Sequence, residues 1–312
     1  MRGYEALRQA AAWRDLSSRG RLKATGADRA RLIHAIASNA VESLAPGQGV
    51  YSFFLDAQGH IQADSNIFVH DDHLVIDSEP DAARSLLSHI ESYIIMDDVT
   101  LEDIGPSTAL LEVAGPSSRD IVASLSQQLP DAPLAFVKAN SFTIYRAPIG
   151  AVEGFRISAP LSDRDRLIDK LESRGAAPAS EESGEALRVL HGIPRFGVDF
   201  GPRNIPHETQ QLQAVSFTKG CYTGQEIVER VRSQGRVRRL LVGVELDSAK
   251  LPQDLTVRYD GAEVGVLTSP TPGTANGDNG RGFAIVKRLA AVPDTVVRVG
   301  ETTGTVTDVA RR

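Results

Sequence analysis

The C-terminal part of the chain limits the fold more than any other stretch, because it consists of short β segments separated by glycine and proline turns. These segments span residues 236–246, 256–259, 263–269, 282–287 and 296–299. Short strands at this spacing are typical of a small all-β barrel or sandwich. We therefore predict a separate β domain over residues 234–312, with its boundary near residues 233–235.

The chain before residue 234 alternates between strand and helix patterns. Residues 16–25 are predicted to form a strand, and Gly26 opens a helix that carries apolar residues on one face. The same order recurs where a strand over residues 109–113 is followed by Gly115 and a second helix. Further strands are predicted over residues 50–55, 61–69, 73–78 and 94–101. The repeated order indicates two related α+β layers ahead of the β domain.

The composition indicates a globular protein that buries a core. The chain has 312 residues, of which 41% are hydrophobic and 24% charged, and its net charge of -6 argues against wholesale nucleic-acid binding. A single cysteine excludes an internal disulfide, and also a zinc or iron–sulfur site held by several cysteines of this chain. No apolar run is long enough to span a membrane, and we predict a cytoplasmic location, with a processed organellar protein as the alternative.

The most unusual stretch is the octapeptide at residues 219–226, Lys-Gly-Cys-Tyr-Thr-Gly-Gln-Glu, which holds the single cysteine. Thr223 and Glu226 have the spacing of a capping box, which predicts that a helix begins inside the stretch. Cys221 would then precede a helix N-terminus and lie beside Lys219, and both features favour thiolate over thiol. The alternative is a small, buried, inert cysteine, and the local chemistry leaves the two interpretations evenly balanced.

A basic cluster follows the octapeptide directly. Its members are Arg230, Arg232, Arg236, Arg238 and Arg239. Such a cluster suits an anion site for phosphate, RNA or the carboxylates of a ligand. The alternative, which we favour slightly, is a solvated helix end where arginines complement the helix dipole.

Asp64 lies inside a predicted strand, where a carboxylate should face solvent or a polar pocket. In a cleft it would suit a heteroaromatic ring with N–H donors, although an isolated acidic residue is more often a surface carboxylate. Glu208 has the same two interpretations. His191 and His207 have no second ligand at a convincing spacing, so we predict no metal site.

The octapeptide resembles the signature of the YgfZ family, which comprises folate-binding proteins that support iron–sulfur enzymes. The resemblance extends along nearly the whole chain. Its further matches are Arg19-Gly20-Arg21, Tyr51-x-x-Phe54-Leu55 with Gly59 and Asp64, Gly192-x-Pro194-x-x-Gly197-x-Asp199, Pro206-x-Glu208 and Gly265-x-Leu267-Thr268-Ser269. The wider superfamily includes the glycine-cleavage T-protein, an aminomethyltransferase that uses tetrahydrofolate.

This resemblance implies an α+β fold of the glycine-cleavage T-protein type, a three-domain cloverleaf around a central folate cavity. The first domain would be discontinuous, with residues 1–48 and 138–233, and would carry the Cys221 motif. Residues 49–137 would form an inserted α+β domain, and residues 234–312 the C-terminal β-barrel. The internal repeat described above fits that arrangement.

The resemblance also implies roles for particular residues. Cys221 would be the working thiol, Lys219 would hold it as thiolate, and Asp64 would face the pterin ring of tetrahydrofolate or a related folate. The residues implied in cofactor binding are Asp64, Arg188, Glu208, Tyr222, Gln225 and Arg236. The implied partners are folate and iron–sulfur enzymes or cluster-assembly proteins. A protein partner is needed because one thiolate cannot hold an iron–sulfur cluster by itself. We predict no membrane partner and no strong nucleic-acid binding.

Two departures from the aminomethyltransferases favour the accessory role. Those enzymes carry paired aspartates where this chain has Ala63-Asp64, and a glutamate where this chain has Leu190 or His191. The first alternative is a tetrahydrofolate-dependent aminomethyltransferase or methyltransferase, based on the shared fold and Asp64. The second is an RNA- or tRNA-associated role, which only the arginine cluster suggests.

Overall fold

A computed structural model describes residues 1–235, 237–273 and 278–309 of the chain. The chain divides into two compact units that each draw on several stretches of sequence. Unit 1 comprises Met1–Leu55, Gln62–Leu187 and Ala214–Thr223, and unit 2 comprises Asp56–Ile61, Arg188–Gln213 and Gly224–Arg312. The three-domain boundaries given above stay a prediction.

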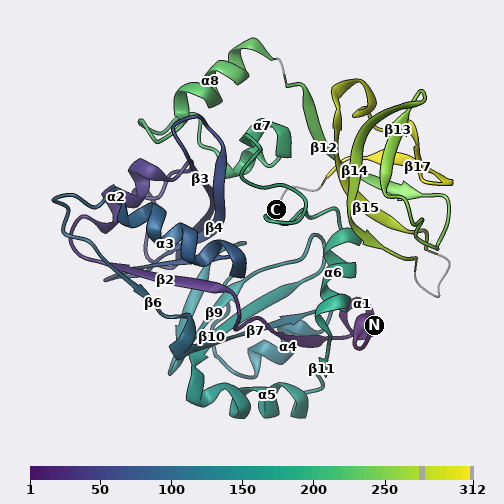
Figure 1. The fold of residues 1–312 in the computed structure, drawn as a ribbon. Helices are drawn as coiled ribbons and strands as arrows, with labels where there is room; N and C mark the ends of the chain where they lie inside the picture. The colour runs from purple at the N-terminus through teal and green to yellow at the C-terminus, as the bar shows by residue number, and fades with distance from the viewer. Residues whose placement is uncertain (236, 274–277, 310–312) are drawn as a thin grey trace. The chain divides into compact units, whose positions relative to one another are not determined.

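Unit 1 contains a five-stranded sheet with the strand order β3-β4-β5-β2-β6. Its strands are β2 (Gly20–Thr25), β3 (Gln48–Leu55), β4 (Ile61–Val69), β5 (Leu74–Ser78) and β6 (Thr100–Asp103). Two helices belong to this region, α2 (Arg29–Ile36) and α3 (Ala83–Glu91). Helix α3 packs against β2 and buries Leu86 and Ile90, which lie four residues apart on its apolar face (Figure 1).

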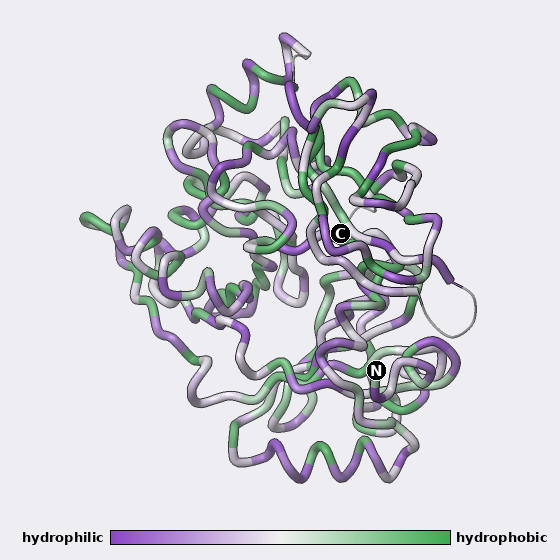
Figure 2. The backbone as a smooth tube through the Cα atoms, turned by 45° about the vertical axis from the view of Figure 1, so that its right-hand side comes forward, coloured by the Kyte–Doolittle hydropathy of each residue, from purple (hydrophilic) through white to green (hydrophobic). Residues whose placement is uncertain are grey.

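A second sheet in unit 1 has six strands in the order β11-β1-β7-β10-β9-β8. They are β1 (Ala12–Asp15), β7 (Thr108–Ala114), β8 (Phe136–Ala139), β9 (Phe142–Arg146), β10 (Gly154–Pro160) and β11 (Ala177–Pro178). The helices of this region are α1 (Tyr4–Gln9), α4 (Ser118–Ala123), α5 (Arg164–Ser173) and α6 (Glu181–Leu190). Hydrophobic and hydrophilic residues alternate along α5, which runs across the bottom of Figure 2, and its Leu167 and Leu171 enter the core.

The two sheets of unit 1 meet through an aromatic cluster. The ring of Phe68 on β4 lies 4.4 Å from that of Tyr145 on β9, centroid to centroid. Val75 and Phe136 complete the cluster. Burying large aromatic rings at this contact fixes one sheet against the other.

Charged side chains join the same two sheets. Asp77 on β5 accepts hydrogen bonds from Arg19 Nε at 2.7 Å and from Arg156 Nη1, on β10 of the second sheet, at 2.9 Å. Arg156 also pairs with Glu112 on β7, as does Arg14. Burial opposes the ionised form of Asp77, but the two arginines outweigh it and hold the pKa of this carboxyl below its usual value.

Unit 2 contains the β structure predicted from the C-terminal segments, and it is a closed barrel rather than a sandwich. The order is β12-β15-β14-β13-β16-β17, and each pair is antiparallel (Figure 1). The strands are β12 (Arg239–Leu246), β13 (Thr256–Tyr259), β14 (Ala262–Thr271), β15 (Arg281–Lys287), β16 (Val296–Val299) and β17 (Thr302–Thr307). Inward-facing valines and leucines fill the interior, as closure of a small barrel requires. Helices α7 (Pro206–Thr209) and α8 (Gln225–Gln234) also belong to unit 2.

The predicted strand–glycine–helix repeat is confirmed at both of its turns. Gly26 follows β2 with a φ of 104°, and Gly115 follows β7 with a φ of 125°. A Cβ atom would lie 1.9 Å from the carbonyl oxygen of Asp98 at the first position and 2.5 Å from that of Ala10 at the second. Only glycine combines this backbone conformation with so close an approach.

Two local predictions are wrong. Residues 12–15 form β1, although we expected the first strand to begin at residue 16, and β2 begins only at Gly20. Most of the strand predicted over residues 94–101 is irregular, with a bend at Ile95 and Met96, and β6 begins only at Thr100. Among the described residues, none of the helices combines the length and the apolar character that crossing a membrane requires.

Candidate functional site

Residues 219–224 of the octapeptide form a loop in which Cys221 is exposed. Helix α8 begins at Gln225, and its N-cap is Gly224, with a φ of 80° and no side-chain capping hydrogen bond. The predicted capping box of Thr223 and Glu226 is therefore wrong. The Glu226 carboxylate pairs with Arg230 at 2.6 Å, one turn along the helix, and glycine makes the turn by its backbone conformation alone.

The ammonium of Lys219 points at backbone carbonyls rather than at the thiol. Its Nζ donates to the carbonyl oxygens of His34, Ala37 (2.6 Å) and Asn39 (3.2 Å), and it lies 5.0 Å from the ring centroid of Tyr222. Burial, opposed by the negative charge of Glu42, lowers the pKa of Lys219 to about 8. These contacts show that Lys219 binds three backbone carbonyls, a structural role that its sequence position beside Cys221 did not indicate.

The backbone of the loop is fastened to the same segment of unit 1. Ser38 Oγ donates to the carbonyl of Ala214 at 2.6 Å, and the Ser216 amide donates to the carbonyl of Ser38 at 2.9 Å. The Thr223 amide donates to the carbonyl of Ala35 at 3.3 Å. The loop is thus held on both sides of Cys221 by the end of α2 and the residues that follow it.

Asp64 is buried, with only 1% of its surface exposed, so the interpretation as a surface carboxylate is wrong. It lies on β4, and its Oδ2 accepts a hydrogen bond from the hydroxyl of Tyr51 on β3 at 2.8 Å. The Tyr51 hydroxyl thus orients the carboxylate within the sheet. The predicted contact of Asp64 with a pterin ring stays a prediction.

A chain of hydrogen bonds links the Cys221 loop to Asp64 within unit 1. Lys219 Nζ donates to the carbonyl of Asn39, and Asn39 Nδ2 donates to the carbonyl of Tyr51 at 2.9 Å. Tyr51 then donates to Asp64. The structure therefore brings together two regions that the sequence marked separately, through Asn39, which we did not single out.

Arg188 is buried and committed to protein partners. Its guanidinium donates to Asp199 at 2.8 Å, to the carbonyl of Ile193 at 3.0 Å and to Ser269 Oγ at 2.6 Å. Asp199 also accepts from Ser269 and from Thr268, both on β14. These contacts give Arg188, Asp199, Thr268 and Ser269 a structural role within unit 2. A role of Arg188 in cofactor binding stays a prediction.

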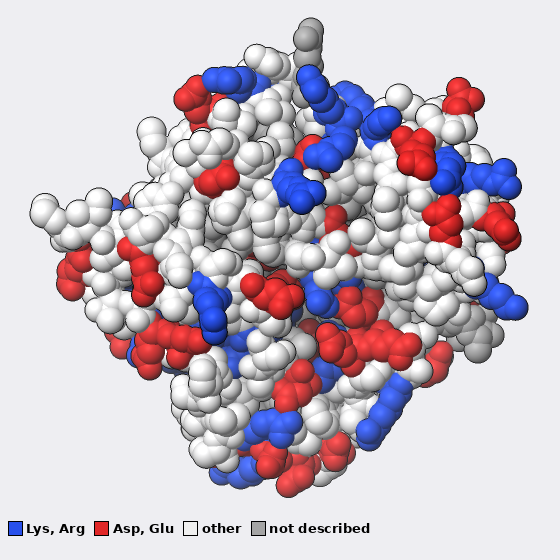
Figure 3. Space-filling view, in the orientation of Figure 1, with Lys and Arg blue, Asp and Glu red and all other residues white. Residues whose placement is uncertain are grey.

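Glu208 is likewise buried, and it accepts hydrogen bonds from Asn204 at 2.9 Å and from Arg239 at 3.2 Å. Arg232 pairs with Glu229 of its own helix. Basic side chains gather over α8 near the top of the molecule in Figure 3, with acidic ones beside them. Together with the Arg230–Glu226 pair, these contacts favour a solvated helix end over an open anion site.

The remaining predicted residues differ in what the structure says of them. Gln225 is the first residue of α8, and Tyr222 is buried beneath the ammonium of Lys219. Arg236 lies outside the described residues. Within the part of the chain that the structure describes, no group of three or more His, Cys, Asp or Glu side chains is placed to hold a metal ion.

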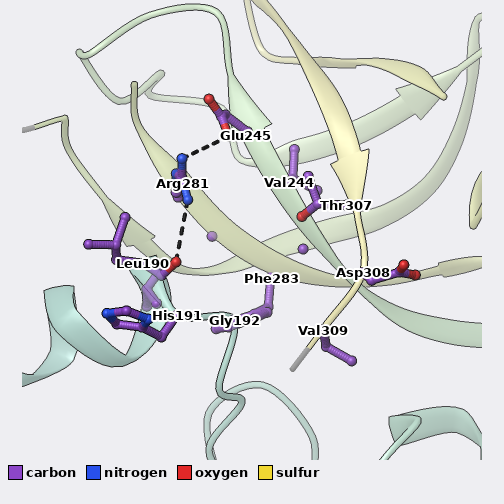
Figure 4. A pocket seen from close by; sticks show the side chains of 13 residues that line it. Leu190, His191, Gly192, Val244, Glu245, Arg281, Phe283, Thr307, Asp308 and Val309 are labelled. Atoms are coloured by element: carbon purple, nitrogen blue, oxygen red, sulfur yellow. Dashed lines mark hydrogen bonds and ion pairs between the residues drawn. The ribbon is translucent and has the colours of Figure 1, made fainter. Parts of the chain in front are cut away.

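A pocket of about 450 Å³ lies in unit 2, between the end of α6 and the barrel. Leu190 and His191 line it on one side, and Arg281 bridges the Leu190 carbonyl and the Glu245 carboxylate at 3.3 and 2.9 Å (Figure 4). Phe283 contributes to the wall between them. None of the described residues predicted to bind a cofactor lines this pocket, so it is distinct from the predicted folate contacts.

Comparison with known proteins gives a consistent family. Residues 1–219 match the family model of the GCVT N-terminal domain. The tRNA-modifying protein YgfZ of Yersinia pestis is 27% identical over 73% of this chain and 69% of its own. A chloroplastic protein of Arabidopsis thaliana that bears a transferase name is 29% identical over 92% of this chain and 68% of its own. The predicted cytoplasmic location stays a prediction.

The structure closely matches that of the glycine cleavage system aminomethyltransferase T of Bartonella henselae. The TM-score is 0.88 at 18% identity, and the match covers 98% of this chain and 87% of the other. The predicted fold of the glycine-cleavage T-protein type is therefore confirmed. Since the family model covers more than two thirds of the sequence, the chain belongs to the GCVT N-terminal domain family, as a YgfZ-like member.

Proposed function

We propose that this chain is a tetrahydrofolate-binding accessory protein that supports iron–sulfur cluster assembly or repair, with Cys221 as the functional thiol. The observation that carries the proposal is the single cysteine itself, exposed on a loop that is fastened on both sides. An inert cysteine is normally buried as a small apolar residue. A thiol held out to solvent by a fixed loop is instead placed to meet a partner molecule.

The folate part of the proposal is supported by the fit of Asp64. A pterin ring presents N–H donors along one edge, and a buried carboxylate oriented by Tyr51 is a matching acceptor. Folate bound there would supply or accept one-carbon units, or would report folate status to the thiol loop. The residues of this chain would bind and orient the ring, and the Tyr51 hydroxyl would keep Asp64 in position.

A client protein must complete any cluster that Cys221 touches, because one thiolate cannot hold a cluster alone. The YgfZ relatives are named for tRNA modification. The net charge of -6 and the glutamate partners of Arg230, Arg232 and Arg239 disfavour direct binding of tRNA. We therefore propose that this chain acts on tRNA modification indirectly, by supporting an iron–sulfur enzyme that carries out the modification.

The proposal is tested by rescue of a strain that lacks this function. Cys221→Ser should abolish rescue while leaving tetrahydrofolate binding, measured by calorimetry, at the wild-type level. Asp64→Asn should weaken folate binding and retain the exposed thiol. Full rescue by the Cys221 variant would contradict the role of the thiol, and unchanged folate affinity in the Asp64 variant would contradict the folate site.

The second candidate is a tetrahydrofolate-dependent aminomethyltransferase, which the buried Asp64 favours. It predicts turnover when tetrahydrofolate and an aminomethyl or N-methyl donor are supplied together. Folate binding without turnover would exclude it and would leave the accessory role. The side chains of Leu190 and His191 speak against it, because neither supplies the carboxylate that the aminomethyltransferases carry there.

A further inference from the structure

The end of helix α2 and the segment that follows it present three backbone carbonyls to one side chain. The carbonyl groups of His34, Ala37 and Asn39 all accept from Lys219 Nζ. The last carbonyls of a helix have no partner within the helix, so a lysine that reaches them satisfies groups that would otherwise need water. An ammonium has three N–H donors, and here all three have an acceptor.

The contacts of the loop converge on the same place. Ser216 and Thr223 lie on either side of Lys219 in the sequence. The amide of Ser216 donates to the carbonyl of Ser38, and the amide of Thr223 donates to the carbonyl of Ala35. Ser216 Oγ accepts from the Lys219 amide at 3.1 Å. The lysine therefore lies at the centre of a set of hydrogen bonds that fixes residues 214–223 to residues 34–39, and Cys221 protrudes from that set.

We infer that Lys219 is a positioning residue, whose ammonium clamps the Cys221 loop onto the end of α2 and so fixes where the thiol stands. This role differs from the one that its sequence position suggested, stabilisation of the thiolate by a neighbouring charge. The functional importance of holding Cys221 in place rests on the proposed function. The clamp itself can be measured in the purified protein without folate or a client protein.

Few charged groups surround this ammonium. Within the described residues no carboxylate lies at ion-pair distance, and Glu42 is the acidic group that acts on it from farther away. His34 is the other titratable neighbour, and burial and the charge of Lys219 lower its pKa. The pKa of Lys219, about 8, lies within the pH range that an experiment can cover, so the effect of the lysine proton on the clamp can be measured.

The sign of the pH effect follows from the direction of the pKa shift. Docking lowers the pKa of Lys219 to about 8, because burial disfavours the charged form, whereas an undocked lysine has a pKa of about 10.4. By linkage the docked loop should therefore become more stable as the pH rises above 8. An arginine at the same position would stay charged throughout, because its pKa is above 12.

Hydrogen exchange of the Ser216 and Thr223 amides, measured between pH 6.5 and 9.5, tests the inference. Each observed exchange rate is compared with the rate of the same amide in an unstructured peptide at that pH, which gives the protection. The wild-type protection should rise as the pH passes from 8 to 9.5. Lys219→Met should lower protection at least tenfold at pH 7, whereas Lys219→Arg should keep it without the rise, because arginine stays charged. Lys138→Met is the matched control, since this exposed lysine of unit 1 pairs with Asp71, far from the Cys221 loop in the sequence.

Wild-type protection in Lys219→Met, or identical pH profiles for the wild type and Lys219→Arg, would overturn the clamp. If Lys219→Met fails to fold, as Trp13 fluorescence would reveal, the comparison of the wild type with Lys219→Arg decides alone. Failure of the proposed function has a different signature. Full rescue by Cys221→Ser would remove the role of the thiol and leave the exchange results unchanged.

Discussion

The buried charges between the two sheets of unit 1 predict a large loss of stability in Asp77→Asn. The carboxylate accepts from Arg19, Arg156 and Asn66, at 2.7, 2.9 and 3.3 Å, and all of these side chains are largely withdrawn from water. An amide keeps the shape but removes the charge that compensates two guanidinium groups. Removing one partner of a buried ion pair costs about 3–5 kcal/mol, because the other charge stays buried.

Urea unfolding followed by tryptophan fluorescence measures this loss directly. Trp13 is the single tryptophan and lies on β1, in the second sheet of unit 1, so it reports the unit that Asp77 stabilises. With a slope of about 1–3 kcal/mol per molar urea, the midpoint should fall by at least about 1 M. Glu102→Gln, an exposed change on β6 of the first sheet, is the control and should leave the midpoint unchanged.

The pH dependence gives an independent check with a defined sign. The pKa of Asp77 is lowered in the folded state, since the arginines outweigh the effect of burial. Its contribution to stability is therefore complete above the unfolded pKa of about 3.9 and is lost as the pH falls through the folded pKa. The gap between wild type and Asp77→Asn should shrink only below about pH 3.9. A midpoint unchanged by Asp77→Asn at pH 7 would refute the reasoning.

Three further predictions concern other parts of the chain. Tyr51→Phe removes the donor that orients Asp64, and should raise the dissociation constant for tetrahydrofolate about tenfold in calorimetry. Arg188→Met leaves a buried carboxylate unpaired, and should destabilise unit 2 by about 3–5 kcal/mol, measured by hydrogen exchange of barrel amides. Gly115→Ala forces a strained φ and a clash, and should cost about 1–3 kcal/mol by urea unfolding. A wild-type value in any of these assays contradicts the corresponding argument.

The barrel could be predicted from sequence because its signals are local. Its strands are short segments rich in β-branched and other apolar residues, and glycine or proline marks the turns between them. The wrong strand over residues 94–101 shows the limit of the same signal. Ile95 and Met96 are apolar, yet their residues are 86% and 93% exposed, so hydrophobicity alone did not indicate burial.

Two residues of the candidate site could be singled out from the sequence, and their roles stay predictions. Cys221 and Asp64 could be singled out from residue type and neighbours, and the structure shows one exposed and the other buried. The task of Lys219 could not be predicted, because its acceptors lie on residues 34–39, about 180 positions away in the sequence. Sequence neighbours suggested Cys221 as its partner, whereas the fold supplies three carbonyls.

Arg188 is a second residue whose structural role is visible only in the folded chain. The family resemblance implied a cofactor contact for Arg188, which stays a prediction, and the structure adds that its guanidinium is held by Asp199 and by Ser269 of the barrel. This structural role could not be predicted from sequence, because the two partners lie 11 and 81 positions away.

The most direct test of the central claim is rescue of a strain deficient in this function by Cys221→Ser, with client iron–sulfur enzyme activity as the measured quantity. Serine keeps the size and polarity of the exposed side chain and removes only the thiol. We predict activity at the level of the empty vector, with tetrahydrofolate affinity and the urea midpoint at their wild-type values. Wild-type activity in this variant would contradict the claim that the thiol carries the function.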